Sequence, residues 1–273
     1  TVSQIYKGNY KERREVVIGF DLGTSCSKVI LQDRQLKKCY AIPFDDLGFP
    51  RNKYLLPTKA FICKNGILSL YSGDYEYRNI KMNFIHAPQK EIYLDNESDL
   101  HWTATDLFVG YMGLVLTEAR RMFFSTREKE YKDVKIDWEF NIGTPSRSYD
   151  DTALLNRTKV AGLAAWNISL LQMDKITIHS IKNALERASL QVEQDTYDEG
   201  KNEIHPSLVG AVPEIIAEVV GFAKSPLRED GMYMMVDVGS ITVDASTFII
   251  HKNIDEEDAY AILTSSVENN GTY

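Results

Sequence analysis

The sequence contains little cysteine, no long apolar run and no basic stripe. Its three cysteines, Cys26, Cys39 and Cys63, are odd in number and fit no metal-binding spacing, so we expect reduced thiols and a cytoplasmic location. No apolar run reaches the roughly 18 residues of a membrane-spanning helix. A net charge of −8 and a pI of about 5.2 argue against nucleic acid as the main partner. Neither a membrane nor a nucleic acid is therefore expected to bind this chain.

The remaining composition is that of an ordinary globular protein. Hydrophobic residues make up 44% of the 273 positions and charged residues 26%. A chain of this length is long enough for two domains or for one large domain with two lobes.

One stretch near the N-terminus carries the first chemical signal. The apolar run 16–20 is typical of a buried strand, and residues 29–31 form a second short apolar run. The turn that joins them begins with Asp21 and Gly23 and ends at Lys28, with hydroxyl side chains in between. Glycine allows a close backbone approach or a positive φ. Such a turn can surround an anion, and its carboxylate can hold a hydrated Mg²⁺.

The same pattern returns 216 residues later. An apolar run over residues 232–236 leads to Asp237 and Gly239, and a further strand-like run follows at residues 243–250. Two ordinary glycine turns with aspartate caps are the alternative explanation. That alternative does not predict flanking apolar strands or a second copy. The repetition therefore favours a functional pair of turns.

Both turns resemble the phosphate loops of the actin-like ATPase superfamily, which includes DnaK-type heat-shock proteins, actins, bacterial actin relatives and sugar kinases. Residues 21–28 resemble the first loop and residues 237–244 the second, whose DnaK-type form reads D-L-G-G-G-T-F-D. Asp237, Gly239, Thr242 and Asp244 match that form, whereas Ser240 and Ile241 replace two glycines. The resemblance implies ATP and Mg²⁺ as cofactors.

The resemblance also implies a role for each matching residue. Asp21 and Asp237 would hold Mg²⁺ through water and take part in catalysis, and Glu214 would orient the water that attacks the γ-phosphate. An acid favoured by a helix N-terminus is the alternative for Glu214. Lys81 is a loose candidate for a second phosphate contact, and a solvated surface lysine is the preferred reading of it. The implied phosphate contacts are Gly23, Thr24, Ser25, Lys28, Gly239, Ser240, Ile241 and Thr242.

Periodicity predicts the elements between the two loops. Helices are expected over 102–124 and 152–166, and an alternating strand over 134–145. Lys-Asn-Gly at 64–66 predicts the turn of a hairpin between strands at 55–63 and 67–71. Residues 167–206 depart from the family pattern and read as an insertion with a strand at 176–178 and a helix at 181–192. Residues 209–222 resemble the family's connecting helix, with Glu214 after a proline at its start.

The implied fold class is α/β, the actin-like ATPase (ribonuclease-H-like) fold, with lobe I complete with its inserted subdomain and lobe II only begun. A fragment of a longer chain is therefore expected. The predicted boundaries are 1–36 and 101–230 for the lobe I core, 37–100 for the inserted subdomain, and 231–273 for the start of lobe II.

The implied function is an ATP-binding, ATP-hydrolysing, Mg²⁺-dependent switch of a divergent DnaK-like chaperone, with a protein client or a self-assembly partner. Three other functions stay open. These are an actin-like filament or plasmid-segregation ATPase, a small-molecule kinase of the same fold, and a scaffold that does not hydrolyse ATP.

Overall fold

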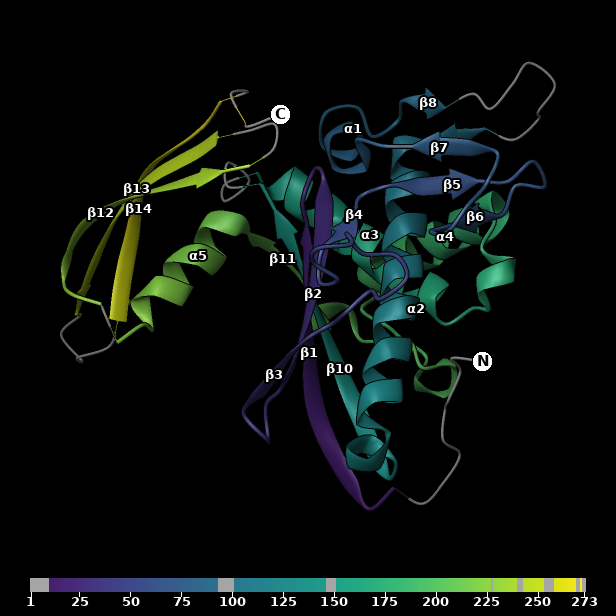
Figure 1. Ribbon diagram of the computed structural model, residues 1–273, viewed down its shortest axis with the longest axis horizontal. Coiled ribbons are helices and arrows are strands. Elements are labelled where there is room, and N and C mark those ends of the chain that lie inside the picture. Colours follow the sequence, from purple (N-terminus) through teal and green to yellow (C-terminus); the bar gives the residue numbers. More distant parts are fainter. Residues whose placement is uncertain are drawn as a thin grey trace. The chain divides into compact units, whose positions relative to one another are not determined.

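The computed structural model describes residues 10–92, 101–145, 151–226, 228–239, 243–252, 258–268 and 271. The chain divides into two compact units (Figure 1). The first unit comprises Thr1–Ile142 and Asn156–Gly210, and the second comprises Gly143–Leu155 and Ala211–Tyr273.

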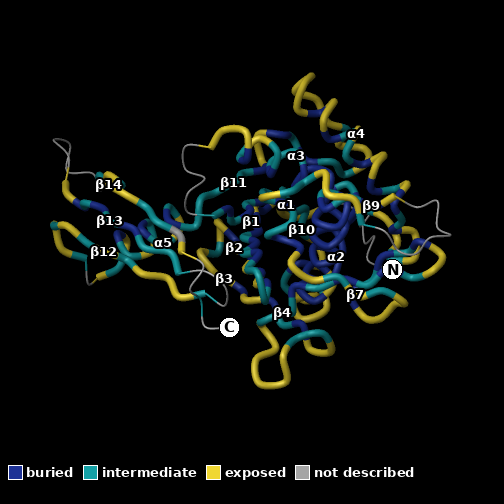
Figure 2. The backbone as a smooth tube through the Cα atoms, turned by 90° about the horizontal axis from the view of Figure 1, so that it is seen from above, coloured by how far each residue is buried: buried dark blue, intermediate teal, exposed yellow. Residues whose placement is uncertain are grey.

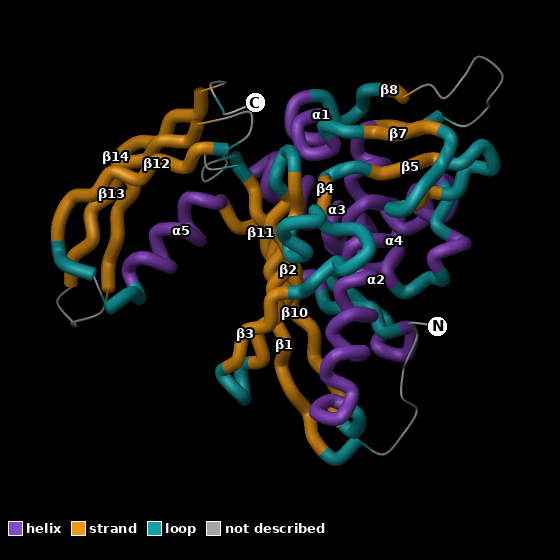
Figure 3. The backbone as a smooth tube through the Cα atoms, viewed as in Figure 1, coloured by secondary structure: helices purple, strands orange, loops and turns teal. Residues whose placement is uncertain are grey.

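A mixed sheet forms the centre of the first unit. Its strands lie in the order β11-β10-β1-β2-β3, and the short strand β4 also pairs with β2. Strands β1, β2 and β3 form an antiparallel meander, whereas β10 pairs with β1 in parallel (Figure 3). The strand bounds are β1 Glu12–Leu22, β2 Cys26–Asp33, β3 Lys38–Ala41, β4 Leu56–Pro57, β10 Val134–Thr144 and β11 Val209–Pro213. The predicted α/β class is thus confirmed at the level of a mixed sheet with helices.

Alternation of side chains gives this sheet one buried face. Val16, Ile18 and Phe20 of β1 are buried, and the residues between them are half-buried. In β2, Val29 and Leu31 continue the buried face. Because successive side chains of a strand point to opposite faces, the apolar positions gather on one side of the sheet. Buried positions also run along much of helix α2 (Figure 2).

The long helix α2 (Ala104–Tyr131) is buried over most of its length. Thr103 accepts a hydrogen bond from the Asp106 backbone, and the Asp106 carboxylate accepts one in return, which forms a capping box. A Cβ on Gly113 would stand 2.4 Å from a side-chain carbon of Ile168 in α3 (Thr152–Ser169). The predicted helices over 102–124 and 152–166 are therefore confirmed, and α2 extends further than predicted.

Small elements lie between β4 and α2. Strand β5 (Ala60–Ile62) pairs with β6 (Leu68–Ser69) and with β7 (Tyr75–Tyr77). The hairpin predicted at 64–66 is confirmed, and Gly66 has the positive φ of 76° that its turn needs. The other elements of this part are α1 (Ile80–His86), β8 (Glu91–Ile92) and β9 (Trp102–Thr103).

The stretch 167–206 corrects one prediction. Residues 176–178 were expected to form a strand, but a 3₁₀ turn over Met173–Lys175 is followed by α4 (Ile178–Gln194). The reason is a capping box in which Thr177 and Ser180 satisfy each other's backbone N–H groups, so the chain enters a helix there. The predicted helix at 181–192 is confirmed and begins earlier. Two further 3₁₀ turns cover Glu199–Lys201 and Pro206–Leu208.

The second unit pairs one helix with an antiparallel sheet. The strands lie in the order β12-β13-β14, with bounds β12 Gly231–Val238, β13 Val243–Lys252 and β14 Asp258–Glu268. Helix α5 (Glu214–Ala223) contributes Ile215 and Val219 to a core with Phe248 and Ile250 of β13. Residues 209–213, which were expected to begin the connecting helix, form strand β11 instead, because the helix starts only after Pro213.

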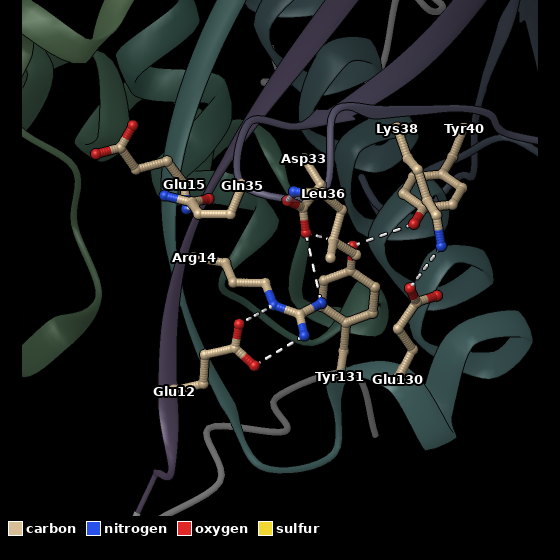
Figure 4. Close-up of polar contacts among 10 residues, drawn as sticks. All are labelled: Glu12, Arg14, Glu15, Asp33, Gln35, Leu36, Lys38, Tyr40, Glu130 and Tyr131. Atoms are coloured by element: carbon tan, nitrogen blue, oxygen red, sulfur yellow. Dashed lines mark hydrogen bonds and ion pairs between the residues drawn. The ribbon is translucent and has the colours of Figure 1, made fainter.

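A buried carboxylate ties the C-terminal end of α2 to the first sheet (Figure 4). Asp33, at the end of β2, is fully buried and accepts hydrogen bonds from the Tyr131 hydroxyl at 2.7 Å and from the Leu36 backbone at 2.7 Å. The Arg14 guanidinium lies 3.6 Å from the same carboxylate and also binds Glu12. Buried polar groups need such partners, so this cluster fixes helix and sheet together.

None of the helices in the described part of the chain is both long enough and apolar enough to cross a membrane.

Candidate functional site

The first turn places a carboxylate and a lysine side by side. Asp21 is the penultimate residue of β1, and Lys28 lies opposite it on β2 in the antiparallel register. The Lys28 Nζ is 2.8 Å from Asp21 Oδ2, and both side chains are about half exposed, at 50% and 45%. The sheet therefore presents one positive and one negative group beside the turn. A ligand made of a metal ion and a phosphate could use both, the carboxylate for the metal and the ammonium for the phosphate.

The turn itself consists of Gly23, Thr24 and Ser25, all half-buried. A Cβ on Gly23 would lie 2.4 Å from the backbone oxygen of Cys26, which is closer than two such atoms can approach. In the described part of the chain, Gly66 is the glycine with a positive φ. Of the two properties for which the sequence suggested a glycine, a close backbone approach and a positive φ, Gly23 is thus required for the close approach.

A chain of buried hydroxyl groups holds this turn from behind, and the sequence did not predict it. The Thr58 Oγ1 donates to the Gly23 carbonyl at 2.9 Å, and the Thr58 backbone N–H donates to the Ser25 carbonyl at 2.9 Å. Thr58 Oγ1 also lies 2.9 Å from Ser27 Oγ, which accepts from the Tyr111 hydroxyl at 2.9 Å. The turn is therefore fixed to α2 through three side chains.

The buried surroundings of these hydroxyl groups favour their neutral forms. Burial raises the pKa of the Tyr111 phenol, so it remains a hydrogen-bond donor. Burial also raises the pKa of the Cys26 thiol, although Lys28 lowers it in part. A thiol with a raised pKa is a poor nucleophile. Cys26 therefore serves as a packed residue beside the turn.

The strands of the second hairpin repeat the register of the first. Asp237 is the penultimate residue of β12, Gly239 follows the strand, and Asp237 pairs with Asp244 across the hairpin. The spacing from Asp237 to Asp244 equals the spacing from Asp21 to Lys28, seven residues in each case. Ser240, Ile241 and Thr242, three of the predicted phosphate contacts, lie outside the described residues.

Like charges face each other across the second hairpin. Asp237 is exposed and Asp244 half-buried, and the two share one face of the sheet as direct cross-strand neighbours. Two carboxylates opposite each other destabilise a hairpin unless a cation or a donor balances them. Carboxylate oxygens are also the ligands that Mg²⁺ prefers. This pair has the donor chemistry that a divalent cation would need.

The remaining predicted residues lie elsewhere. Glu214 is the first residue of α5, directly after Pro213, where the positive end of the helix dipole favours an acid. Its side chain is half-buried. Lys81 lies in α1 and is 8% exposed, which overturns the reading of it as a solvated surface lysine. The turn of α1 that carries Lys81 directs it inward, next to the buried Ile80.

A metal held only by protein side chains finds no support in the described residues. No group of three or more His, Cys, Asp and Glu side chains lies close enough together there. Carboxylates can also act in a different mode, in which Mg²⁺ keeps most of its waters and binds phosphate oxygens.

These features define a mixed α/β protein with a five-strand mixed sheet, flanking helices and two hairpins of the same Asp-x-Gly construction. The chain matches no model of a known protein family and no curated protein.

Proposed function

We propose that this chain is the nucleotide-binding region of an ATP-dependent switch with the actin-like ATPase fold. The strand order β3-β2-β1-β10-β11 supports the fold, because a three-stranded meander is extended by a parallel strand on the side of β1. Helix α2 connects β3 to β10 after the small elements that follow β4, as an inserted subdomain would require.

The observation that carries the proposal is the repeated hairpin. In each copy the aspartate is the penultimate residue of a strand, a glycine follows the strand, and the partner of the aspartate on the second strand lies seven residues on. Each copy then continues into a third antiparallel strand, β3 in one unit and β14 in the other. Two copies of the same hairpin indicate that both serve the same function. Turns of this kind are well suited to bind an anion.

The proposed roles follow from the chemistry of each side chain. Asp21 and Asp237 hold the waters of Mg²⁺, and Lys28 moves from Asp21 to a phosphate when nucleotide binds. The backbone and hydroxyl groups of the two turns contact phosphate oxygens. Glu214 orients the attacking water at the γ-phosphate. Phosphoryl transfer requires these three contributions: charge neutralisation, a positioned metal and an in-line nucleophile.

One observation favours a second candidate, a nucleotide-binding scaffold without hydrolysis. The position of Glu214 at the first residue of α5 is explained by the helix dipole alone, so its carboxylate need not serve catalysis. The two functions separate in a turnover assay, since both bind nucleotide and one of them releases phosphate.

Isothermal titration calorimetry with ATP tests the proposal. We expect saturable binding in the presence of Mg²⁺ and its loss in excess EDTA, because the two carboxylates attract the metal–nucleotide complex and repel the bare polyphosphate. Binding followed by phosphate release identifies the switch, and binding without release identifies the scaffold. Sedimentation that depends on ATP would identify the protein as a filament-forming ATPase. Transfer of phosphate to an added small molecule would identify it as a kinase. The absence of any Mg²⁺-dependent binding would contradict the proposal.

A further inference from the structure

A large cavity lies in the first unit, away from the first turn. Its volume is about 510 Å³, which suits a small organic molecule. Its walls come from the beginning of β1, the first half of β10, the end of α3 and the 3₁₀ turns before β11. Along β1, Glu15 at the cavity lies six positions before Asp21 at the turn, a distance of about 20 Å in a strand.

One cation in this cavity has no anion beside it. Arg120 of α2 lines the cavity and is 7% exposed. Its Nη2 donates to the backbone and hydroxyl oxygens of Ser169, and its guanidinium stacks on the Trp166 ring at 4.7 Å. Its Nε is buried and has no acceptor, and no carboxylate within the described residues pairs with it.

The other lysines and arginines of the cavity wall differ from Arg120 in this respect, because each has a carboxylate partner. Arg13 pairs with Asp137, and Arg34 pairs with Glu139 at 2.6 Å. The remaining two pairs are Lys135 with Glu199 and Lys201 with Asp198. Arg34 also lies 3.4 Å from a second carboxylate of the wall, Glu15, so the wall as a whole is neutral. Among the described residues, Arg120 is the arginine of the wall that has no carboxylate partner.

A purely structural role for Arg120 accounts for part of this arrangement. Ser169 is the last residue of α3, so Nη2 meets the negative end of that helix, which carries about half an elementary charge. The helix end supplies no acceptor to Nε. A buried, unpaired charge is costly, and burial lowers the pKa of Arg120 to about 10. Arg120 therefore still lacks an anionic partner.

Apolar and aromatic side chains form the rest of the wall around Arg120. Trp138 of β10 and Trp166 of α3 lie with their ring centres 6.0 Å apart, and Phe124 lines the cavity beside them. Leu170 and Ile204 add aliphatic surface. These side chains give apolar contact to the body of a ligand whose charged end meets the guanidinium.

We propose that this cavity binds a small monocarboxylic acid with an apolar body, with its carboxylate on the guanidinium of Arg120. A carboxylate can accept a charge-assisted hydrogen bond from the part of the guanidinium that does not bind Ser169. A single negative charge balances the single unpaired cation. This site is separate from the two turns and does not depend on the proposed nucleotide function.

Calorimetry with matched acid and amide probes tests the site. The probes are 4-phenylbutyrate, octanoate and indole-3-propionate, each compared with its uncharged primary amide on the wild-type chain. We expect at least one acid to bind about tenfold or more tightly than its amide, because only the acid accepts from the guanidinium as an anion. Equal binding of every acid and its amide, or no binding of any probe at millimolar concentration, would overturn the proposal.

A pair of arginine variants locates the effect. Arg120→Met keeps an unbranched, flexible side chain and removes the charged guanidinium, so the preference for the acid should disappear. Arg157→Met is the matched control, since Arg157 also stacks on an aromatic ring, that of Phe84 at 5.1 Å, and also has a buried Nε without an acceptor in the described residues, but does not line the cavity. It should keep the full preference. Retention of that preference in Arg120→Met would also contradict the proposal, and the wild-type comparison decides the case if this variant does not fold.

Discussion

The Gly23→Ala variant is expected to lose Mg²⁺-dependent ATP binding by about tenfold or more and to unfold more easily by about 1–3 kcal/mol. The added Cβ would lie 2.4 Å from the Cys26 backbone oxygen, so the backbone of the turn has to move. The Gly23 and Ser25 carbonyls are held by Thr58, whose hydroxyl belongs to a buried chain that reaches Tyr111. Movement therefore breaks these hydrogen bonds and displaces the groups proposed to contact phosphate.

Gly19→Ala provides the matched control for this variant. Gly19 lies in β1, the strand that leads into the turn, and a Cβ there would meet its nearest neighbour, the Ile30 backbone oxygen, at an ordinary 3.7 Å. We expect its ATP affinity to stay within about twofold of the wild type, with little change in stability. Calorimetry and urea unfolding of both variants measure the two effects. A Gly23→Ala chain that binds ATP as tightly as Gly19→Ala would contradict the proposed role of the turn.

The Asp33→Ala variant is expected to lose about 3–5 kcal/mol of unfolding free energy, the largest loss of stability that we predict. The fully buried Asp33 carboxylate accepts from the Tyr131 hydroxyl and the Leu36 backbone, and it lies 3.6 Å from the Arg14 guanidinium (Figure 4). Its removal leaves these donors buried without their acceptor, and the Arg14 charge is then balanced by Glu12 alone.

Two further variants separate charge from packing in this cluster. Asp33→Asn keeps an oxygen for the Leu36 N–H and should fall between Asp33→Ala and the wild type. Glu130→Ala removes the carboxylate of a pair with Lys38 that lies at 3.2 Å and is much more exposed, so it should cost at most about 1 kcal/mol. Urea unfolding midpoints at constant slope measure all three changes. A loss below about 1 kcal/mol in Asp33→Ala would show that the cluster does not fix α2 to the sheet.

The sequence was sufficient to predict elements whose pattern is local. The apolar runs on either side of Asp21 and Asp237 predicted both hairpins, and periodicity predicted α2, α3 and β10. Residues 176–178 misled the prediction because alternating Ile-Thr-Ile is typical of a strand, whereas a Thr-x-x-Ser capping box decides the local structure. Capping depends on hydrogen bonds between specific atoms, and hydrophobic periodicity does not detect them.

Contacts between residues far apart in the sequence account for the features that local sequence patterns could not predict. Thr58 lies 35 residues from the carbonyl of Gly23 that it holds, and Tyr111 lies 84 residues from Ser27. Asp33 is the last residue of β2. The alternation of the strand, which places Asp33 on its buried face, is the local signal for the burial of this carboxylate. The burial of Arg120 is of the same kind, because no local pattern shows that Trp166 and Ser169 cover it.

Calorimetry of Mg²⁺–ATP binding by Asp21→Asn, Asp237→Asn and Glu15→Gln tests the central claim, which is that both Asp-x-Gly hairpins serve nucleotide binding. Each aspartate variant removes one carboxylate proposed to hold the waters of the metal, and each should weaken binding about 10–100-fold. Glu15→Gln neutralises an acid on the same face of β1, six residues before Asp21, and should bind as the wild type does. Wild-type affinity in either aspartate variant, or equal losses in all three, would contradict the account.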